Sequence, residues 1–294
     1  MFRPAPDSQL AGRICLVTGA TSGVGRATAL ALARRGATLV IGARNPAKAR
    51  ATVAALRRQS GNTSIEALLA DLSVQGEIHR LAREFRERYG RLDVLVNNAG
   101  ARFLERRLSA DGIEMTFALN HLGYFILTNL LLKELLTGAP GRVVNVASEA
   151  HRLCGGIDFE DLQGEREYQG KAAYAQSKLA NLLFSYELAR QLDGTGVAVN
   201  AVHPGNVLSG FSRNNGWLSW LRHLAGSLAA GELRLPGRAA QGPIYLASAP
   251  EAARVSGRYF VDAAEHQSSE ASREGAAAKR LWEVSLRLTK LAKG

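Results

Sequence analysis

The sequence predicts a doubly wound α/β fold, in which helices cover both faces of a seven-stranded parallel sheet. Short runs of β-branched residues alternate with helical patterns from Ile14 to about Phe260, as in βαβ units with right-handed crossovers. A glycine-rich turn separates the first strand from the first helix. The length of 294 residues and the 46% hydrophobic content suit one large core. We therefore expect a single Rossmann-type domain over residues 1–294.

The alternation assigns an element to most of the chain. Each expected strand is short and apolar, and most are followed by a longer stretch with helical periodicity. The strands are expected at 14–18, 38–42, 64–69, 92–96, 142–147, 197–202 and 258–260. The helices are expected at 23–35, 46–59, 74–89, 112–137, 171–192 and 238–247.

Two segments depart from this alternation. Residues 206–238 form a long connection, in which Trp217, Leu218, Trp220, Leu221 and Leu224 recur at helical spacing. This apolar stripe predicts a segment that covers the substrate, although a core contact, a subunit contact or a membrane-surface patch would explain it equally. Residues 269–291 predict a charged C-terminal helix.

Composition excludes several classes of protein. The net charge is +11, but the arginines are scattered over helical faces without a nucleic-acid-binding motif, so no nucleic acid partner is expected. The two cysteines lack disulfide or metal spacing, and the six histidines include no ligand pair, so no metal site is predicted. A small molecule is the expected partner. A homo-oligomer is compatible with the sequence.

We expect a cytoplasmic protein without an integral membrane segment. Residues 1–10 lack the apolar core of a secretory signal. The longest apolar stretch, 125–136, is interrupted by Asn129, Lys133 and Glu134 and is too short to span a bilayer.

The glycine-rich turn has the sequence Thr-Gly-Ala-Thr-Ser-Gly-Val-Gly over residues 18–25. At the start of a helix, free backbone N–H groups and the helix dipole attract a pyrophosphate, and glycines let the backbone approach it closely. The alternative is a glycine-rich turn without a ligand, but the position directly after the first strand favours a dinucleotide site. The expected cofactor contacts here are Gly19, Thr21, Ser22, Gly23, Val24 and Gly25.

The residue after the second strand bears on the choice of cofactor. An NAD enzyme usually carries an acidic residue there to bind the ribose 2′-hydroxyl. This chain has Gly42-Ala43-Arg44-Asn45, and the guanidinium of Arg44 can fork onto a 2′-phosphate. Arg44 therefore predicts NADP(H), with an ordinary surface arginine as the alternative.

Tyr174 and Lys178 are the candidate reacting pair. Their spacing of four residues places both side chains on one face of the expected helix. A neighbouring ammonium stabilises phenolate, which would let the tyrosine exchange a proton near neutral pH. Ser148 directly follows an apolar strand, so its hydroxyl can reach a substrate oxygen at the same sheet edge. An amphipathic helix and a strand-ending serine would explain the same residues without chemistry.

These motifs together resemble the short-chain dehydrogenase/reductase family. The glycine turn, Asn97-Asn98-Ala99-Gly100, Ser148, Tyr174-x-x-x-Lys178 and His203-Pro204-Gly205 match that family in order and spacing. The resemblance implies that Lys178 also holds the nicotinamide ribose, and that Asn120 anchors a water linking the lysine to solvent. It implies further cofactor contacts at Asp71, Leu72, Asn98, Ala99, Gly100, Tyr174, Lys178, Pro204, Gly205 and Val207.

Several passages look like the retinol dehydrogenase-like branch of this family. They are Asn120-His121-Leu122-Gly123-Tyr124-Phe125, Asp161-Leu162-Gln163-Gly164-Glu165, Ser177-Lys178-Leu179-Ala180-Asn181 and Arg280-Leu281-Trp282-Glu283-Val284-Ser285. Members of that branch that act on retinoids are often anchored to membranes at the N-terminus. This chain begins almost at its first strand, so a diffusible apolar or aromatic ketone or aldehyde is as plausible.

The expected activity is hydride transfer between NADP(H) and an alcohol/carbonyl pair. In this interpretation Asn120, Ser148, Tyr174 and Lys178 form the catalytic site, and Tyr174 acts as acid/base. Two alternatives remain: an NADP(H)-binding regulatory protein without turnover, and an NADPH-dependent reductase of carbon–carbon double bonds.

Overall fold

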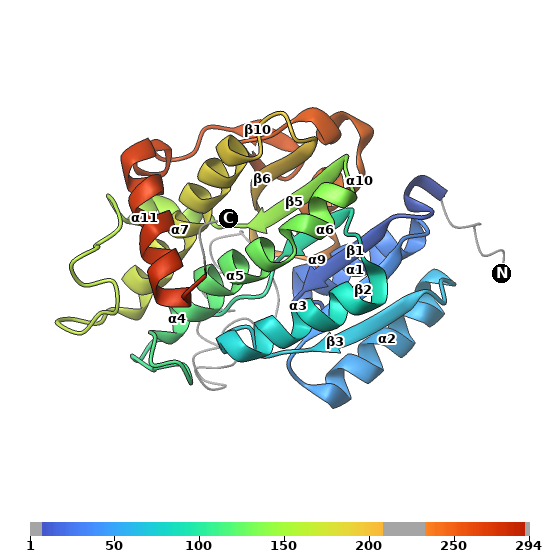
Figure 1. Cartoon of the computed structure of the whole chain (residues 1–294), viewed down its shortest axis with the longest axis horizontal. Coiled ribbons are helices and arrows are strands. Elements are labelled where there is room, and N and C mark those ends of the chain that lie inside the picture. The colour runs from blue at the N-terminus through green and yellow to red at the C-terminus, as the bar shows by residue number, and fades with distance from the viewer. Residues whose placement is uncertain (1–7, 208–232, 292–294) are drawn as a thin grey trace.

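The structure, a computed structural model, describes residues 8–207 and 233–291. Its centre is an eight-stranded sheet with the strand order β10-β9-β6-β5-β4-β1-β2-β3 (Figure 1). The strands are β1 (Ile14–Thr18), β2 (Thr38–Ala43), β3 (Ile65–Leu69), β4 (Val94–Asn97), β5 (Gly141–Val146), β6 (Val197–His203), β9 (Arg258–Val261) and β10 (Ala264–His266). All pairs are parallel except β9–β10, so the predicted doubly wound fold is confirmed.

The predicted strand count of seven is wrong by one. The additional strand, β10, pairs antiparallel to β9, with Val261 opposite Ala264. Asp262 in the connecting turn adopts a left-handed conformation with φ of 56°. The three residues of β10 are all exposed, so they carry no hydrophobic alternation from which the strand could be predicted.

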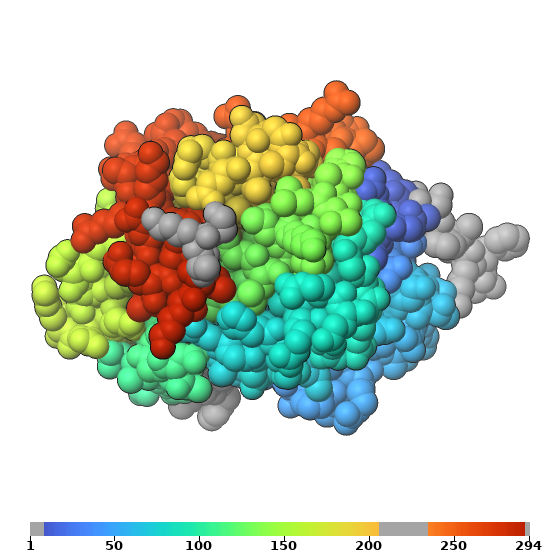
Figure 2. Space-filling view, viewed as in Figure 1, coloured from blue at the N-terminus to red at the C-terminus, as the bar shows by residue number. Residues whose placement is uncertain are grey.

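Helices cover both faces of the sheet. Because successive side chains of a strand point to opposite faces, one strand contributes residues to the core on each side. Leu16 of β1 joins the core beneath α3, α5, α7 and α11, whereas Cys15 and Val17 join the core beneath α1, α2 and α10. These helices are α1 (Gly23–Arg34), α2 (Pro46–Ser60), α3 (Gln75–Tyr89), α5 (Gly123–Leu130), α7 (Gly170–Gln191), α10 (Gln241–Ser248) and α11 (Gly275–Thr289). In Figure 2, the red residues of α11 lie against the yellow segment that includes part of α7.

The predicted helix over 112–137 is interrupted in the structure. It consists of α4 (Met115–Phe117), a π-helical turn η2 (Ala118–Leu122), α5 and α6 (Leu132–Thr137). The side chain of Glu114 caps α4 by accepting hydrogen bonds from the amides of Thr116 and Phe117. The wider π turn carries Asn120, whose side chain is fully buried. Hydrophobic periodicity does not reveal such a turn, because the residues on both sides of it are apolar.

Two other predicted helices also differ from the structure. The helix expected at 238–247 is divided into α9 (Pro236–Ala239) and α10, because Pro243 has no amide hydrogen to bond the carbonyl of Ala239. The C-terminal helix α11 begins at Gly275, later than expected, after a 3₁₀ turn over Ala271–Arg273.

The predicted substrate-covering segment, 206–238, lies mostly outside the described residues, and so does its whole apolar stripe. Its two ends form a short parallel pair, β7 (Asn206–Val207) with β8 (Leu233–Arg234). In the described part of the chain, no helix has the length and apolar character needed to cross a membrane.

Candidate active site

The strand order reverses between β1 and β4, and the predicted cofactor turn lies at this point. In open α/β sheets, ligands bind at the carboxyl ends of the strands beside such a reversal. The turn after β1 leads into α1, whose N-cap, Ser22, forms no side-chain cap hydrogen bond. The first turn of α1 also contains no acidic residue. The N-terminal end of α1 therefore fits the phosphate group of a dinucleotide.

Glycines are required in this turn because the chain packs against itself. A Cβ atom on Gly25 would lie 2.6 Å from the carbonyl oxygen of Gly19 and would overlap Nδ2 of Asn98. A Cβ atom on Gly19, where φ is +65°, would lie 2.8 Å from Cα of Ala99. The absence of a side chain at Gly19 and Gly25 thus lets the turn pack against Asn98 and Ala99, which follow β4.

Asn98 and Thr18 join this turn to β4. Nδ2 of Asn98 donates to the carbonyl of Thr18 over 2.8 Å. The hydroxyl of Thr18 accepts hydrogen bonds from the amides of Asn98 and Ala99, at 2.9 and 3.1 Å. Sequence reasoning missed this role of Thr18, although its position at the end of β1 placed it beside the turn. Asn98 and Ala99, predicted as cofactor contacts, fix the shape of the turn.

Arg44 and Asp71 are in contact with each other. Arg44 is largely exposed at the end of β2, and its Nη1 lies 3.2 Å from Oδ2 of Asp71. Burial would raise the pKa of Asp71, but hydrogen bonds from Ser73 and Arg44 hold it below its ordinary value. The pair lies at the edge where an adenosine is expected to bind. Arg44 is therefore not an isolated surface arginine.

The predicted catalytic side chains converge on the carboxyl ends of β4 and β5. Lys178 projects from α7, is 3% exposed, and donates from Nζ to the carbonyl of Val146 over 2.9 Å. Its Nζ lies 5.8 Å from the centre of the Tyr174 ring. A Cβ atom on Gly100 would lie 3.1 Å from Oδ1 of Asn120 and 3.7 Å from Nζ of Lys178. Gly100 thus lies against both side chains.

Burial is the largest influence on the pKa values of Lys178 and Tyr174. Burial lowers the pKa of Lys178 to about 7. Burial raises the pKa of Tyr174, and a hydrogen bond with Ser148 and the positive charge of Arg102 offset part of that increase. Tyr174 is consequently a protonated phenol at neutral pH, which is the form that can donate a proton to a carbonyl oxygen.

Asn120 is held in place by both ends of its amide. Its Oδ1 accepts from the amide of Ala101 and its Nδ2 donates to the carbonyl of the same residue, each over 2.9 Å. Nδ2 also donates to the hydroxyl of Ser177, 3.0 Å away. Sequence reasoning missed the role of Ser177, which precedes Lys178 and joins the turn that carries Asn120 to helix α7.

The remaining predicted contacts follow β3 and β6. Leu72 is buried beside Asp71, and the amide of Gly205 lies 3.4 Å from Nδ1 of His203. Pro204 is buried between these two residues. Val207 belongs to the short strand β7. The roles of these residues toward a cofactor stay predictions.

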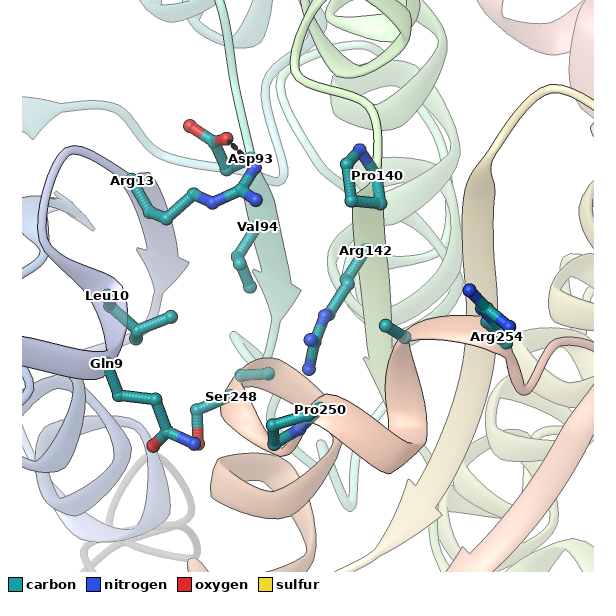
Figure 3. A pocket seen from close by; sticks show the side chains of 12 residues that line it. Gln9, Leu10, Arg13, Asp93, Val94, Pro140, Arg142, Ser248, Pro250 and Arg254 are labelled. Atoms are coloured by element: carbon teal, nitrogen blue, oxygen red, sulfur yellow. Dashed lines mark hydrogen bonds and ion pairs between the residues drawn. The ribbon is translucent and has the colours of Figure 1, made fainter.

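A cavity of about 470 Å³ lies at the opposite edge of the sheet. Figure 3 shows Arg13, Asp93 and Arg142 around it, at the amino ends of β1, β4 and β5. Asp93 pairs with Arg13 over 2.7 Å and also with Arg91. Arg142 donates to the carbonyls of Leu246, in the last turn of α10, and of Ala249, the residue that follows this helix. Those contacts brace the sheet on the side away from the predicted catalytic residues.

Comparison with known proteins agrees with this geometry. Residues 13–216 match the family model described as short chain dehydrogenase. The chain therefore belongs to the short-chain dehydrogenase/reductase family and to its retinol dehydrogenase-like branch, and this membership supports an oxidoreductase of an alcohol/carbonyl pair.

Similar proteins come from animals and bacteria. The chain is 41% identical to retinol dehydrogenase 12 of Mus musculus, over 95% of this chain and 87% of the relative. It is 41% identical to retinol dehydrogenase 13 of Homo sapiens, over 95% and 85%. Among solved structures, the NADP complex of RhlG from Pseudomonas aeruginosa has a TM-score of 0.69 and 32% identity, covering 87% of this chain and 96% of that one.

Proposed function

We propose that the protein is an NADP(H)-dependent oxidoreductase that reduces an apolar ketone or aldehyde to an alcohol, or catalyses the reverse reaction. The observation that carries this proposal is the grouping of three side chains. The hydroxyl of Tyr174 shares a hydrogen bond with Ser148, and its ring lies beside the ammonium of Lys178. This grouping follows β5 and lies at the same sheet edge as the cofactor turn.

Each side chain has a defined task in this proposal. Ser148 donates a hydrogen bond to the substrate oxygen and holds it next to Tyr174. Tyr174 gives its phenolic proton to that oxygen during reduction and removes it during oxidation. Lys178 stabilises the phenolate that remains and binds the nicotinamide ribose. The nicotinamide, when bound, supplies or accepts the hydride.

NADP(H) is the proposed cofactor because of charge. Arg44 follows β2 where an NAD enzyme would carry an acid, and a guanidinium matches a phosphate geometrically. The NADP complex of RhlG, a structure of similar fold, is consistent with this choice. To bind a 2′-phosphate, Arg44 would turn from Asp71 or bridge both groups. Its exposed side chain leaves room for either movement.

The other expectations belong to the same proposal. They are one domain over residues 1–294, a cytoplasmic location, a small-molecule substrate and a covering role for residues 206–238. The names of the relatives support an apolar alcohol or aldehyde as substrate.

The proposal is tested by NADPH and NADH oxidation over a panel of ketones, aldehydes and quinones, with the products identified. We expect consumption of NADPH and formation of an alcohol. Binding of NADPH without turnover across the panel would favour a regulatory protein. A saturated carbonyl product would favour a carbon–carbon double-bond reductase.

A further inference from the structure

His151 is a buried histidine to which the proposed reaction assigns no role. It lies three residues after Ser148, in the 3₁₀ turn η3 (Glu149–Leu153), and its side chain is completely buried. Ser148 is the N-cap of this turn, and its hydroxyl accepts a hydrogen bond from the amide of Ala150 over 3.2 Å. The hydroxyl oxygen is thereby tied to the turn, while its proton is left to donate to another group. The turn therefore determines where the Ser148 hydroxyl lies.

Both ring nitrogens of His151 have a backbone partner. Nδ1 lies 2.7 Å from the carbonyl oxygen of Ser148, and the backbone amide of His151 donates to the same oxygen over 3.2 Å. Nε2 lies 3.1 Å from the backbone amide of Ser269, in the segment that follows β10. The imidazole therefore joins the candidate reacting serine to a part of the chain that comes 118 residues after His151.

These two contacts define where the ring carries its proton. A backbone amide only donates, so Nε2 of His151 must accept the bond from Ser269 with its lone pair. A carbonyl oxygen only accepts, so Nδ1 must carry the proton and donate it to Ser148. The other neutral tautomer and the imidazolium would each direct an N–H group at the amide of Ser269. Only the neutral ring with its proton on Nδ1 satisfies both partners.

The surroundings of His151 keep the ring neutral and in place. The ring of Tyr259, from β9, is arranged edge to face with it at 5.2 Å between centres, and the Tyr259 hydroxyl donates to Oε2 of Glu149 over 2.8 Å. Burial lowers the pKa of His151, and the positive charge of Arg152 acts in the same direction. The hydrogen bond with Ser148 and the negative charge of Glu149 oppose this decrease without cancelling it. The imidazole is therefore uncharged at neutral pH.

We propose that His151 is a positioning residue for Ser148. Its neutral ring ties the Ser148 carbonyl to the Ser269 amide, and so holds the turn that presents the Ser148 hydroxyl to Tyr174.

The consequence for catalysis rests on the proposed function, in which the Ser148 hydroxyl binds the substrate oxygen. A reacting group has to be held within a fraction of an ångström of its productive place. Tyr259 and Ser269, which belong to the last part of the chain, act on the reacting centre through His151.

Two amide side chains separate the two bonds of the ring. Asparagine places its amide near the position of Nδ1, and glutamine, which is one carbon longer, places its amide near the position of Nε2. His151→Asn can therefore keep the bond to the Ser148 carbonyl while it loses the bond to Ser269. His151→Gln can keep the bond to Ser269 while it loses the bond to Ser148. Because each variant is polar and loses one bond, their difference reports on Ser148 and not on general support of the fold.

The geometry is tested without turnover. In NMR of the full chain labelled with ¹⁵N-histidine, we expect the proton of His151 on Nδ1 at neutral pH, with His151→Asn used to assign the signal. A proton on Nε2 would overturn the proposal. In crystal structures, we expect the Ser148 hydroxyl to keep its place beside Tyr174 in His151→Asn and to move away from it in His151→Gln. An unmoved Ser148 in His151→Gln would equally overturn the proposal.

The effect on the reaction is measured as kcat with NADPH and a carbonyl compound that the wild type reduces. We expect kcat to fall about 10- to 100-fold in His151→Gln but less than about 3-fold in His151→Asn, because misplacing a reacting group is costly. The Kd for NADPH should stay unchanged in both variants. Leu56→Ala, in the core beneath α1, α2 and α10, is the control for lost stability and should keep the wild-type kcat while folded.

The outcomes separate this proposal from the proposed function. Equal kcat values in His151→Asn and His151→Gln, or a decrease of the same size in Leu56→Ala, would refute the positioning role. A wild type that reduces no compound of the panel, although His151 carries its proton on Nδ1 and His151→Gln displaces Ser148, would refute the proposed function alone.

Discussion

The cofactor turn and the reacting centre lie at the same sheet edge but are built by different physical means. The turn from Thr18 to Gly25 is shaped by backbone contacts so close that a single Cβ atom on Gly25 would collide with Asn98. The reacting centre is shaped by side chains, and burial changes the pKa values of Tyr174 and Lys178. The turn should therefore be sensitive to added atoms, and the reacting centre to changes in charge or hydrogen bonding.

Tyr174→Phe should have the largest effect on activity. It removes the exchanged proton and keeps the ring beside Lys178. We expect kcat for carbonyl reduction to fall roughly 10²- to 10⁴-fold, while the Kd for NADPH, measured by fluorescence titration, changes little. A variant that retains wild-type turnover would remove Tyr174 from the mechanism.

Gly25→Ala tests the steric account of the turn. The added Cβ would overlap Nδ2 of Asn98 and crowd the carbonyl of Gly19, so we expect a loss of about 1–3 kcal/mol in the free energy of unfolding. Weaker NADPH binding should accompany it. The control is Gly76→Ala in α3, where nothing lies within 4 Å of the new Cβ. Urea denaturation of both variants should separate them, and equal stability would contradict the steric account.

Lys178→Met tests the cost of the buried ammonium. Because the folded-state pKa, about 7, lies below the unfolded value, the unfolded chain binds the additional proton between about pH 7 and 10.5. The penalty is complete below pH 7 and disappears as the pH rises through that range. We expect the variant to be more stable than the wild type by about 1–3 kcal/mol at pH 6, after the lost hydrogen bond to Val146 is counted.

The pH dependence identifies the source of that difference. In urea denaturation at pH 6, 8 and 9.5, the stability advantage of Lys178→Met should shrink as the pH rises. A constant advantage would assign it to packing instead of charge.

Arg44→Ala should produce the smallest change, confined to one cofactor. The loss of a guanidinium from a 2′-phosphate should raise the KM for NADPH about 10-fold, with little change for NADH. Arg50→Ala, which removes an exposed arginine from neighbouring helix α2, is the control. Equal changes in KM for the two cofactors would argue against Arg44 as the phosphate ligand.

Particular residues show what sequence reasoning could reach. The strand at 14–18 was predicted to the residue, because its apolar run ends abruptly at the glycine turn. Asn120, Ser148, Tyr174 and Lys178 could be named because their spacing and order form a pattern. Neither the single domain nor the roles of the predicted site residues has been tested, and they stay predictions.

Other features depend on contacts between distant segments. The π turn that carries Asn120 is bonded to Ala101, and the hydroxyl of Thr18 is bonded to Asn98 and Ala99 across 80 and 81 residues. Tyr124 and Asn181 were named from the sequence only as parts of passages that resemble the retinol dehydrogenase-like branch, without a role of their own. Only the structure shows that both side chains are buried and carry polar atoms without a hydrogen-bond partner in the described residues.

The central claim, hydride transfer from NADPH to a carbonyl carbon, is tested most directly with cofactor deuterated at the transferred position. Cinnamaldehyde is a suitable substrate because it is apolar and aromatic, and contains both a carbonyl and a carbon–carbon double bond. We predict cinnamyl alcohol with one deuterium on the carbinol carbon. Deuterium on the carbon β to the carbonyl, in a saturated aldehyde, would contradict the account, as would a complete absence of transfer to any compound of the carbonyl panel.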